Sequence, residues 1–215
     1  GDVVLVELAE SVARPAGKRP FVSVGWPGLV GVLSGQSASL ALAVMVVHNA
    51  EGAVAGVPFQ LAFRRVLEEA EDGPAAERLL RDLPLTVTNN LMVVDGAGDA
   101  RVLELHPDGI AVRRPDAAGR LVATNHFLTR ERREARLSFE YVSSLRRYKA
   151  VREAARDQGP VTLEDARAAL DAASVPITLQ SMIFLPAERA LEVSLPARGD
   201  ATRGTWVRLE GLLSD

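Results

Sequence analysis

Stretches with the pattern of β-strands and stretches with the pattern of α-helices follow one another in blocks along this chain. The order is strands, helices, strands, helices and strands, which favours layers of antiparallel sheet with helices outside, an α+β fold class. The expected strands cover residues 3–10, 21–26, 29–33, 40–47, 85–94, 100–105, 109–113, 120–124, 178–185, 190–195 and 205–209. The expected helices run from Pro58 to a break at Gly73-Pro74, over 75–83, within 130–157 and onward from Thr162.

Three local patterns make sharper predictions. Residues 40–47 form a continuous apolar run, which predicts a strand covered on both faces. The sequence Asp95-Gly96-Ala97-Gly98 predicts a hairpin turn. Thr162 and Asp165 have the spacing of a helix capping box, with Asp in place of the preferred Glu or Gln.

Length and composition exclude several classes of protein. The 215 residues contain no obvious linker, so a single domain over 1–215 is expected. The net charge of −3 gives no strong field toward nucleic acid or an anionic membrane. No apolar run is long enough to span a bilayer and no signal peptide precedes the first strand, so a cytoplasmic location is expected. Arginine far outnumbers lysine, which together with abundant Ala, Val and Leu suggests a GC-rich bacterial genome.

Several chemistries lack the residues they need. The sequence has no cysteine, which excludes disulfides, thiolate zinc sites and cysteine catalysis within these residues. His48, His106 and His126 do not pair at metal-ligand spacing, so neither a metal site nor a cofactor is expected. No G-x-S-x-G motif supports a serine triad, and residues 95–99 do not form a phosphate-binding loop. Residues 130–156 carry glutamates among their arginines, which favours an exposed salt-bridged helix over a nucleic-acid surface.

Six strings, spread over nearly the whole chain, carry a family resemblance. They are SVGWPGLVGVLSG at 23–35, GVPFQLAFRRVLEEA at 56–70, NNLMVVDGAGDARVLELHP at 89–107, ATNHF at 123–127, SSLRR at 143–147 and TLQSMIFLP at 178–186. In this order they resemble the penicillin acyl-coenzyme A acyltransferase family, the C45 peptidases, which is related to bile salt hydrolases and acid ceramidase. The resemblance implies an αββα sandwich of N-terminal-nucleophile hydrolase type, with two stacked, mostly antiparallel sheets and helices outside.

The resemblance also implies an activity, hydrolysis of an amide C–N bond or acyl transfer. In the family, a cysteine exposed as a new N-terminus by autoproteolysis attacks an amide carbonyl and forms an acyl-enzyme. The α-amino group of that cysteine is the base, which a thiol needs because only a few per cent of it is ionised near neutral pH. Water then completes hydrolysis, or an amine completes acyl transfer. The implied partner is a small-molecule amide or acyl donor.

The family's cysteine, and the arginine and aspartate that follow it, have no counterpart in this sequence. Gly1 has no side chain that could attack. We therefore expect the nucleophile segment to lie upstream, the chain alone to be inactive, and the chain to associate with that segment or as a homo-oligomer. The alternative is a degenerate relative that binds a ligand without chemistry. The missing cysteine and the altered segment GQSASLAL at 35–42 favour that alternative.

Two residues are candidates for the catalytic machinery. Asn125 matches the family asparagine whose side-chain amide donates to the oxyanion, a neutral donor that stabilises developing negative charge. The alternative is an asparagine that merely forms a turn after a strand. Arg146 lies where the family often places an arginine near the site, although a solvated arginine on a basic helix is the other interpretation.

Four further residues are predicted to contact substrate. Trp26 begins a Trp-Pro-Gly bend that either shapes the wall beside the nucleophile or only joins two strands. Asn49 lies near the expected backbone donor of the oxyanion hole, in the region whose spacing is altered. His126 and Phe127 follow Asn125 directly. Asn90 and Asp95 are interpreted as framework residues.

Overall fold

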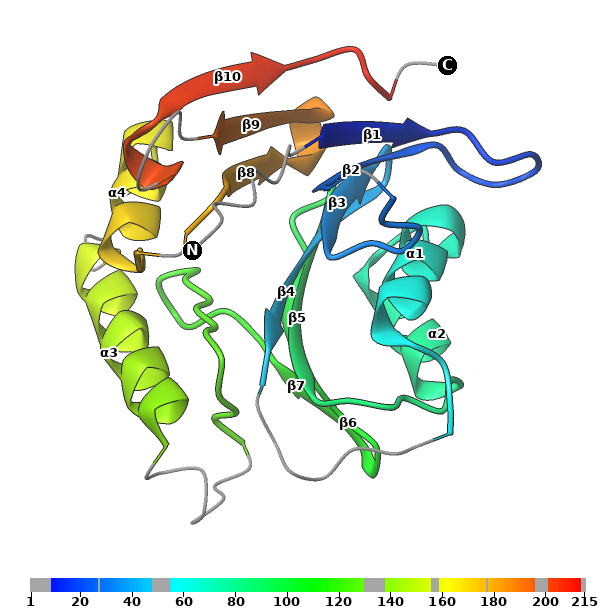
Figure 1. Ribbon diagram of the computed structural model, residues 1–215, viewed down its shortest axis with the longest axis horizontal. Coiled ribbons are helices and arrows are strands. Elements are labelled where there is room, and N and C mark those ends of the chain that lie inside the picture. Colours follow the sequence, from blue (N-terminus) through cyan, green and yellow to red (C-terminus); the bar gives the residue numbers. More distant parts are fainter. Residues whose placement is uncertain are drawn as a thin grey trace, which may run out of the picture.

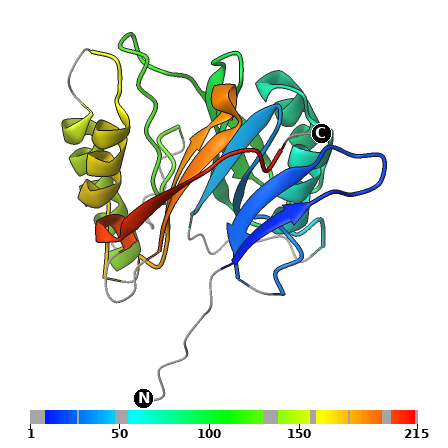
Figure 2. The same cartoon turned by 90° about the horizontal axis from the view of Figure 1, so that it is seen from above.

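Two antiparallel sheets and two pairs of helices form four layers (Figures 1 and 2). The computed structural model describes residues 9–26, 28–47, 55–129, 138–155, 159–176, 178–195 and 201–213. The helices are α1 (Phe59–Glu69), α2 (Gly73–Arg81), α3 (Phe139–Ala154) and α4 (Leu163–Ala172). Helices α1 and α2 cover one face of a seven-stranded sheet, a three-stranded sheet faces the other, and α3 and α4 lie beyond the smaller sheet. This arrangement confirms the α+β sandwich expected from the sequence.

The large sheet follows chain order, with every neighbouring pair of strands antiparallel. Its strands are β1 (Ala9–Ala13), β2 (Phe21–Gly25), β3 (Ser34–Ser37), β4 (Leu40–Val46), β5 (Asn89–Asp95), β6 (Ala100–His106) and β7 (Gly109–Arg113). The small sheet has the order β10-β9-β8, from β8 (Ser181–Leu185), β9 (Ala190–Leu195) and β10 (Thr205–Leu209). Two short 3-10 helices, η2 (Pro186–Glu188) and η3 (Ala201–Arg203), flank β9.

Alternation along the strands divides the interior into two cores. On β4, Leu40 and Leu42 belong to a core shared with α1 and α2, whereas Ala41 and Ala43 line a cavity on the opposite face. Leu40, Ala41 and Leu42 are buried, whereas the following residues are half-buried and Val46 is 37% exposed, so the predicted cover on both faces holds only for the first part of the strand. A second, smaller core joins the two sheets through Val22, Val24, Leu191, Val193 and Leu213.

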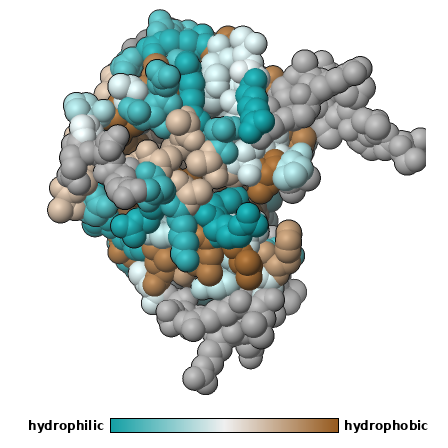
Figure 3. Space-filling view, turned by 90° about the vertical axis from the view of Figure 1, so that its left-hand side faces the viewer, coloured by the Kyte–Doolittle hydropathy of each residue, from teal (hydrophilic) through white to brown (hydrophobic). Residues whose placement is uncertain are grey.

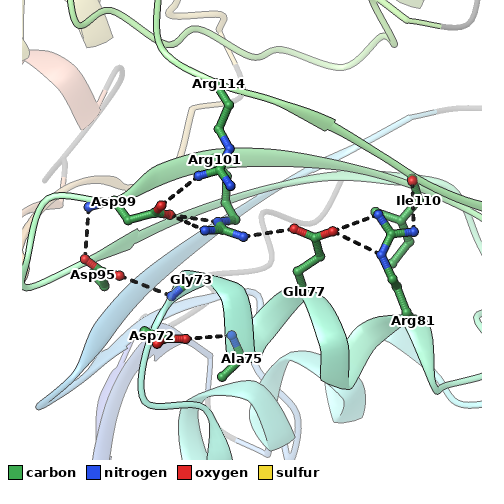
Figure 4. A network of polar contacts seen from close by, with 10 residues as sticks. All are labelled: Asp72, Gly73, Ala75, Glu77, Arg81, Asp95, Asp99, Arg101, Ile110 and Arg114. Atoms are coloured by element: carbon green, nitrogen blue, oxygen red, sulfur yellow. Dashed lines mark hydrogen bonds and ion pairs between the residues drawn. The ribbon is translucent and has the colours of Figure 1, made fainter.

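A network of ion pairs links α2 to the hairpin of β5 and β6 (Figure 4). Arg101 is only 1% exposed and donates to Glu77 at 2.9 Å and to Asp99 at 2.6 Å. Arg81 holds the second oxygen of Glu77, and Arg114 holds the second oxygen of Asp99. The buried guanidinium is thus paired with two carboxylates, the condition under which an interior charge is tolerated.

The hairpin and the capping box predicted from the sequence are present. Asp95 accepts hydrogen bonds from the amides of Ala97 and Asp99, and Gly98 has a φ of +91°, a conformation that favours glycine. Thr162 accepts from the amide of Asp165, whose carboxylate accepts in return from the amide of Thr162. The short Asp side chain therefore completes a capping box.

Several predicted elements differ from the structure, and residues 3–8 of the predicted strand 3–10 lie outside the described residues, with β1 beginning at Ala9. Residues 29–33 form bends, and the strand is the more polar segment Ser34–Ser37, whose buried residues do not look apolar in sequence. Residues 120–124 form no strand: the carbonyls of Val122 and Thr124 accept from the side chains of Arg113 and Asn90 instead of from a neighbouring strand. Gly73-Pro74 does not precede α2 but begins it, with Asp72 as the cap. Proline is tolerated in a first turn because its missing N–H has no helical partner there.

Candidate active site

Asn125 lies in an irregular loop and connects the end of β4 to α3. Its amide nitrogen Nδ2 donates to the carbonyl of Val46 at 2.8 Å, and its oxygen Oδ1 accepts from Nη1 of Arg147 at 3.0 Å. The contact with Arg147 determines which end of the amide is the oxygen, because a guanidinium can only donate. A primary amide has two N–H groups, and Val46 occupies one of them. The other remains able to donate to a substrate oxygen.

Buried polar residues on the sheet hold the loop on both sides of Asn125. Nδ2 of Asn90 on β5 donates to the carbonyls of Thr124 and His126, both at 2.7 Å. Glu104, opposite Asn90 on β6, accepts from the amides of Leu128 and Thr129. Asn90 is therefore a framework residue whose role is to position the loop of Asn125.

His126 lies inside the protein and fastens the same loop to α3. It is 3% exposed, and Nδ1 lies 2.7 Å from the Ser144 hydroxyl, which in turn donates to Thr124. The ring packs edge-on against Tyr141 and Tyr148, with centroids 5.5 and 5.6 Å away. These contacts give His126 a structural role, and its contact with substrate stays a prediction from the sequence.

Charge and burial determine the protonation of this cluster. Burial lowers the pKa of His126, and the positive charges of Arg113 and Arg147 lower it further against the opposing effect of Glu104. The imidazole is therefore neutral near pH 7. Burial also lowers the pKa of the Arg147 guanidinium, which nevertheless stays protonated.

The arginine in contact with Asn125 is Arg147, the neighbour of the candidate Arg146. Arg146 is exposed on α3, whereas Arg147 is half-buried and bonded to Asn125. One residue on an α-helix corresponds to a rotation of about 100°, enough to exchange an inward for an outward position. The SSLRR string therefore contains the arginine that contacts Asn125. The way α3 packs against the loop turns Arg147, the second of the two arginines, toward Asn125.

An apolar cavity of about 540 Å³ lies beside this cluster. Its walls are the inward face of β4 and β5, residues 121–124, α3, α4 and β8. Thr124 and Arg147 are the only polar side chains among the described residues that line it. The edge of β8 that faces away from β9 has no partner strand in the described part of the chain.

Of the other predicted substrate contacts, Trp26 and Phe127 lie among the described residues. Trp26 is 44% exposed at the end of β2, and Phe127 is half-buried. Within the described ranges, no hydrogen bond, ion pair or ring contact links either residue to Asn125. Asn49 lies outside the described residues. In the same ranges, no three His, Cys, Asp or Glu side chains are grouped as metal ligands would be, and no helix is long and apolar enough to cross a membrane.

The two stacked antiparallel sheets with helices outside are an αββα sandwich of the N-terminal-nucleophile hydrolase type, as the likeness to solved structures shows. Solved structures with this fold include a variant of conjugated bile acid hydrolase from Clostridium perfringens, with TM-score 0.61 and 12% identity over 92% of this chain and 80% of that one. Penicillin V acylase from Agrobacterium tumefaciens has TM-score 0.61 and 14% identity over 94% and 80%. The Caenorhabditis elegans ortholog of N-acylethanolamine-hydrolyzing acid amidase has TM-score 0.56 and 13% identity over 93% and 86%.

The family follows from a second comparison. Residues 20–198 match the family model of acyl-coenzyme A:6-aminopenicillanic acid acyl-transferase. The chain belongs to this acyltransferase family, as the ordered strings in its sequence predicted. Membership supports an amide hydrolase or acyltransferase in general terms.

Proposed function

We propose that the complete protein is an amide hydrolase or acyltransferase that works through an acyl-enzyme on an N-terminal cysteine encoded upstream of Gly1. The observation that carries this proposal is the state of Asn125. Its amide is oriented by Val46 and Arg147 and keeps one N–H for an oxyanion. A donor fixed before the reaction stabilises developing charge without reorganising. A plain turn asparagine would not need a half-buried arginine on its oxygen.

The reaction we propose has two stages. The cysteine thiol gives its proton to the α-amino group of the same residue, and the sulfur attacks the amide carbonyl carbon. The carbonyl oxygen becomes an oxyanion that accepts from Nδ2 of Asn125. The C–N bond then breaks, the amine leaves with the proton, and a thioester remains. Water or a second amine attacks the thioester and releases the cysteine.

The cavity beside β8 supports a place for the upstream segment. The cavity borders β8, the edge strand of the small sheet. Strands β4 and β5 lie on one side of it, and helices α3 and α4 lie on the other. Helix α4 has no fully buried residue and α3 has only Ser144, although Val151 and Leu170 face this cavity. Two helices with apolar inner faces and an unpaired strand edge are the surroundings that an added strand would satisfy.

Hydrogen exchange tests that placement directly. In the complete protein, the β8 amides that point away from β9 should exchange more slowly than in residues 1–215 alone, because an added strand accepts from them. The β9 amides, paired on both sides already, are the internal control. Equal exchange of β8 in the two proteins would show that the segment docks elsewhere.

The substrate we propose is a small-molecule amide or acyl donor. The structural relatives are named for conjugated bile acid, penicillin V and N-acylethanolamine, each a small molecule. A cytoplasmic location and assembly into homo-oligomers stay predictions from the sequence.

The decisive experiment uses the complete reading frame. Incubation with a panel of N-acyl amides, followed by intact-mass spectrometry, should reveal an acyl adduct on the N-terminal cysteine and release of the free amine. Replacing that cysteine by alanine should abolish both. A complete protein that binds these amides but forms no adduct and releases no amine would instead be the non-catalytic relative that the altered segment 35–42 also favours.

A further inference from the structure

Three polar side chains form a closed triangle where the loop of Asn125 meets α3. The Thr124 hydroxyl donates to the main-chain carbonyl of Ser144 at 3.1 Å, and the Ser144 hydroxyl donates to the Thr124 oxygen at 3.0 Å. Each hydroxyl has one proton, so neither has a proton left for the imidazole of His126. Nδ1 of His126 lies 2.7 Å from the Ser144 oxygen and must therefore be the donor. The triangle thus determines the tautomer of His126, with the proton on Nδ1.

The other ring nitrogen of His126, Nε2, is left as an acceptor without a proton. It is buried and has no hydrogen-bond partner among the described residues. The ring packs against Tyr141 and Tyr148 on the inner side of α3. Helix α3 therefore lies between this ring and the face of the molecule shown in Figure 3, where hydrophilic and hydrophobic side chains are mixed. A proton on Nε2 would be a buried charge without an acceptor, which costs free energy.

The charged groups around the ring would not compensate such a charge. Burial lowers the pKa of His126, and the positive charges of Arg113 on β7 and Arg147 on α3 lower it further. Glu104 on β6 has the opposite effect, but its oxygens already accept from Arg113 and from two backbone amides of the loop. Since Glu104 cannot turn to the imidazolium without releasing these donors, His126 can take up a proton only by leaving its position.

A movement of His126 would reach Asn125 by two routes. The first is the main chain, because the two residues are neighbours and the carbonyl of His126 accepts from Asn90. The second is α3, where Ser144 and Arg147 are three residues apart and so lie on the same side of the helix. Arg147 donates to Oδ1 of Asn125. Loss of the contact between His126 and Ser144 therefore loosens α3 at the point where this helix orients the Asn125 amide.

We propose that His126 is a positioning residue of the active site and its pH-sensitive switch. When neutral, it holds the loop of Asn125 against α3; when protonated, it leaves the triangle, releases the Asn125 amide and stops turnover. A donor that can reorient no longer stabilises an oxyanion effectively. The inference rests on the proposed function of Asn125. Burial disfavours the charged ring, so the switch operates in acid, below the ordinary histidine range of about pH 6.5.

Nuclear magnetic resonance of the complete protein tests the link between His126 and Asn125 without relying on turnover. The nitrogen chemical shifts of the His126 ring should show a proton on Nδ1 and none on Nε2 at about pH 7.5. On acidification to about pH 5, the side-chain amide signals of Asn125 should shift in step with protonation of His126. Loss of these signals in Asn125→Asp assigns them, and circular dichroism at each pH monitors folding. This measurement needs no variant of His126.

The pH dependence of turnover tests the switch itself. Protonation of the α-amino base alone lowers turnover about tenfold per pH unit in acid, and protonation of His126 should add about a further tenfold. His126→Asn keeps a donor in the place of Nδ1 but cannot take up a proton, so it should lose this further decrease. His106→Asn is the control. It removes another buried histidine, which lies beside Asp108 at the turn between β6 and β7, and should keep the native slope.

Three results would overturn the inference. A proton on Nε2 in place of Nδ1 would contradict the hydrogen-bond triangle. Titration of His126 without any change in the Asn125 signals would leave His126 with a structural role alone. An equal slope of turnover in the native protein and in His126→Asn would assign the whole decrease to the α-amino base. A complete protein without turnover at any pH, in which the Asn125 signals still follow His126, would instead refute the proposed function and uphold the link.

Discussion

Replacing Asn125 by aspartate separates the two possible roles of this residue more cleanly than replacing it by alanine. The aspartate has nearly the same shape, and its remaining oxygen can still accept from Nη1 of Arg147, a contact of 3.0 Å in the native protein. Only the amide N–H groups are lost, one of which donates to Val46 at 2.8 Å. The substitution therefore removes the donor that the mechanism needs while it keeps the link to α3.

The magnitudes follow from these contacts. Loss of the hydrogen bond to Val46 lowers the free energy of unfolding by about 1 kcal/mol. The new ion pair with half-buried Arg147 raises it by about the same amount. Net stability should therefore change by less than about 1 kcal/mol. Loss of an oxyanion donor costs about 3 kcal/mol in the transition state, a reduction of turnover by about 10² to 10³, and the new negative charge lowers turnover further. The Michaelis constant should change little, because the oxyanion forms only near the transition state.

The assay combines steady-state kinetics of the complete protein with urea unfolding of the same preparation. Asn125→Ala is the companion variant, which loses both contacts and should be destabilised by about 1–2 kcal/mol while it shows a similar loss of turnover. If Asn125→Asp keeps turnover within about threefold of native, the oxyanion assignment is refuted. If unfolding shifts strongly and turnover per folded molecule does not, Asn125 is a turn residue.

Three other predictions concern stability and can be measured on residues 1–215. Arg101→Leu should lower the unfolding free energy in urea by about 3 kcal/mol, because Glu77 and Asp99 lose their shared buried partner; an unchanged midpoint would contradict this account of the network. Because the pKa of His126 is lowered in the folded protein, the unfolded chain binds more protons as the pH falls. The free energy of unfolding should therefore be highest above about pH 6.5 and decrease toward pH 5 by up to about 1.4 kcal/mol per pH unit. His126→Gln should flatten this slope, and an unchanged slope in that variant would show that His126 is not its source. Thr162→Ala should cost about 1 kcal/mol through loss of the α4 cap, measured as a shift in the urea midpoint, and should leave turnover of the complete protein unchanged.

Local sequence patterns predicted most of the helices and strands. The features that they did not predict depend on tertiary contacts. The apolar run at 40–47 and the turn at Asp95 depend on periodicity and turn chemistry, which a single sequence contains. The strand Ser34–Ser37 is polar in composition but buried because of its two neighbours in the sheet, and no local pattern shows that. The choice of Arg147 over Arg146 likewise depends on how α3 is rotated against the loop.

A sequence signal for the site was present in the strands. Asn90 and Glu104 are buried polar residues of β5 and β6, and burying such groups costs free energy unless each finds partners. They lie opposite each other in the sheet and bond to the loop on both sides of Asn125. A segment held by two buried polar residues and by Ser144 has little freedom to move, which is the condition for an oxyanion donor to act without reorganisation. A binding module that had lost its chemistry would have no need of that rigidity, since an apolar pocket binds through its walls. The buried hydrogen bonds that hold the short loop around Asn125 therefore favour the enzyme over the non-catalytic alternative.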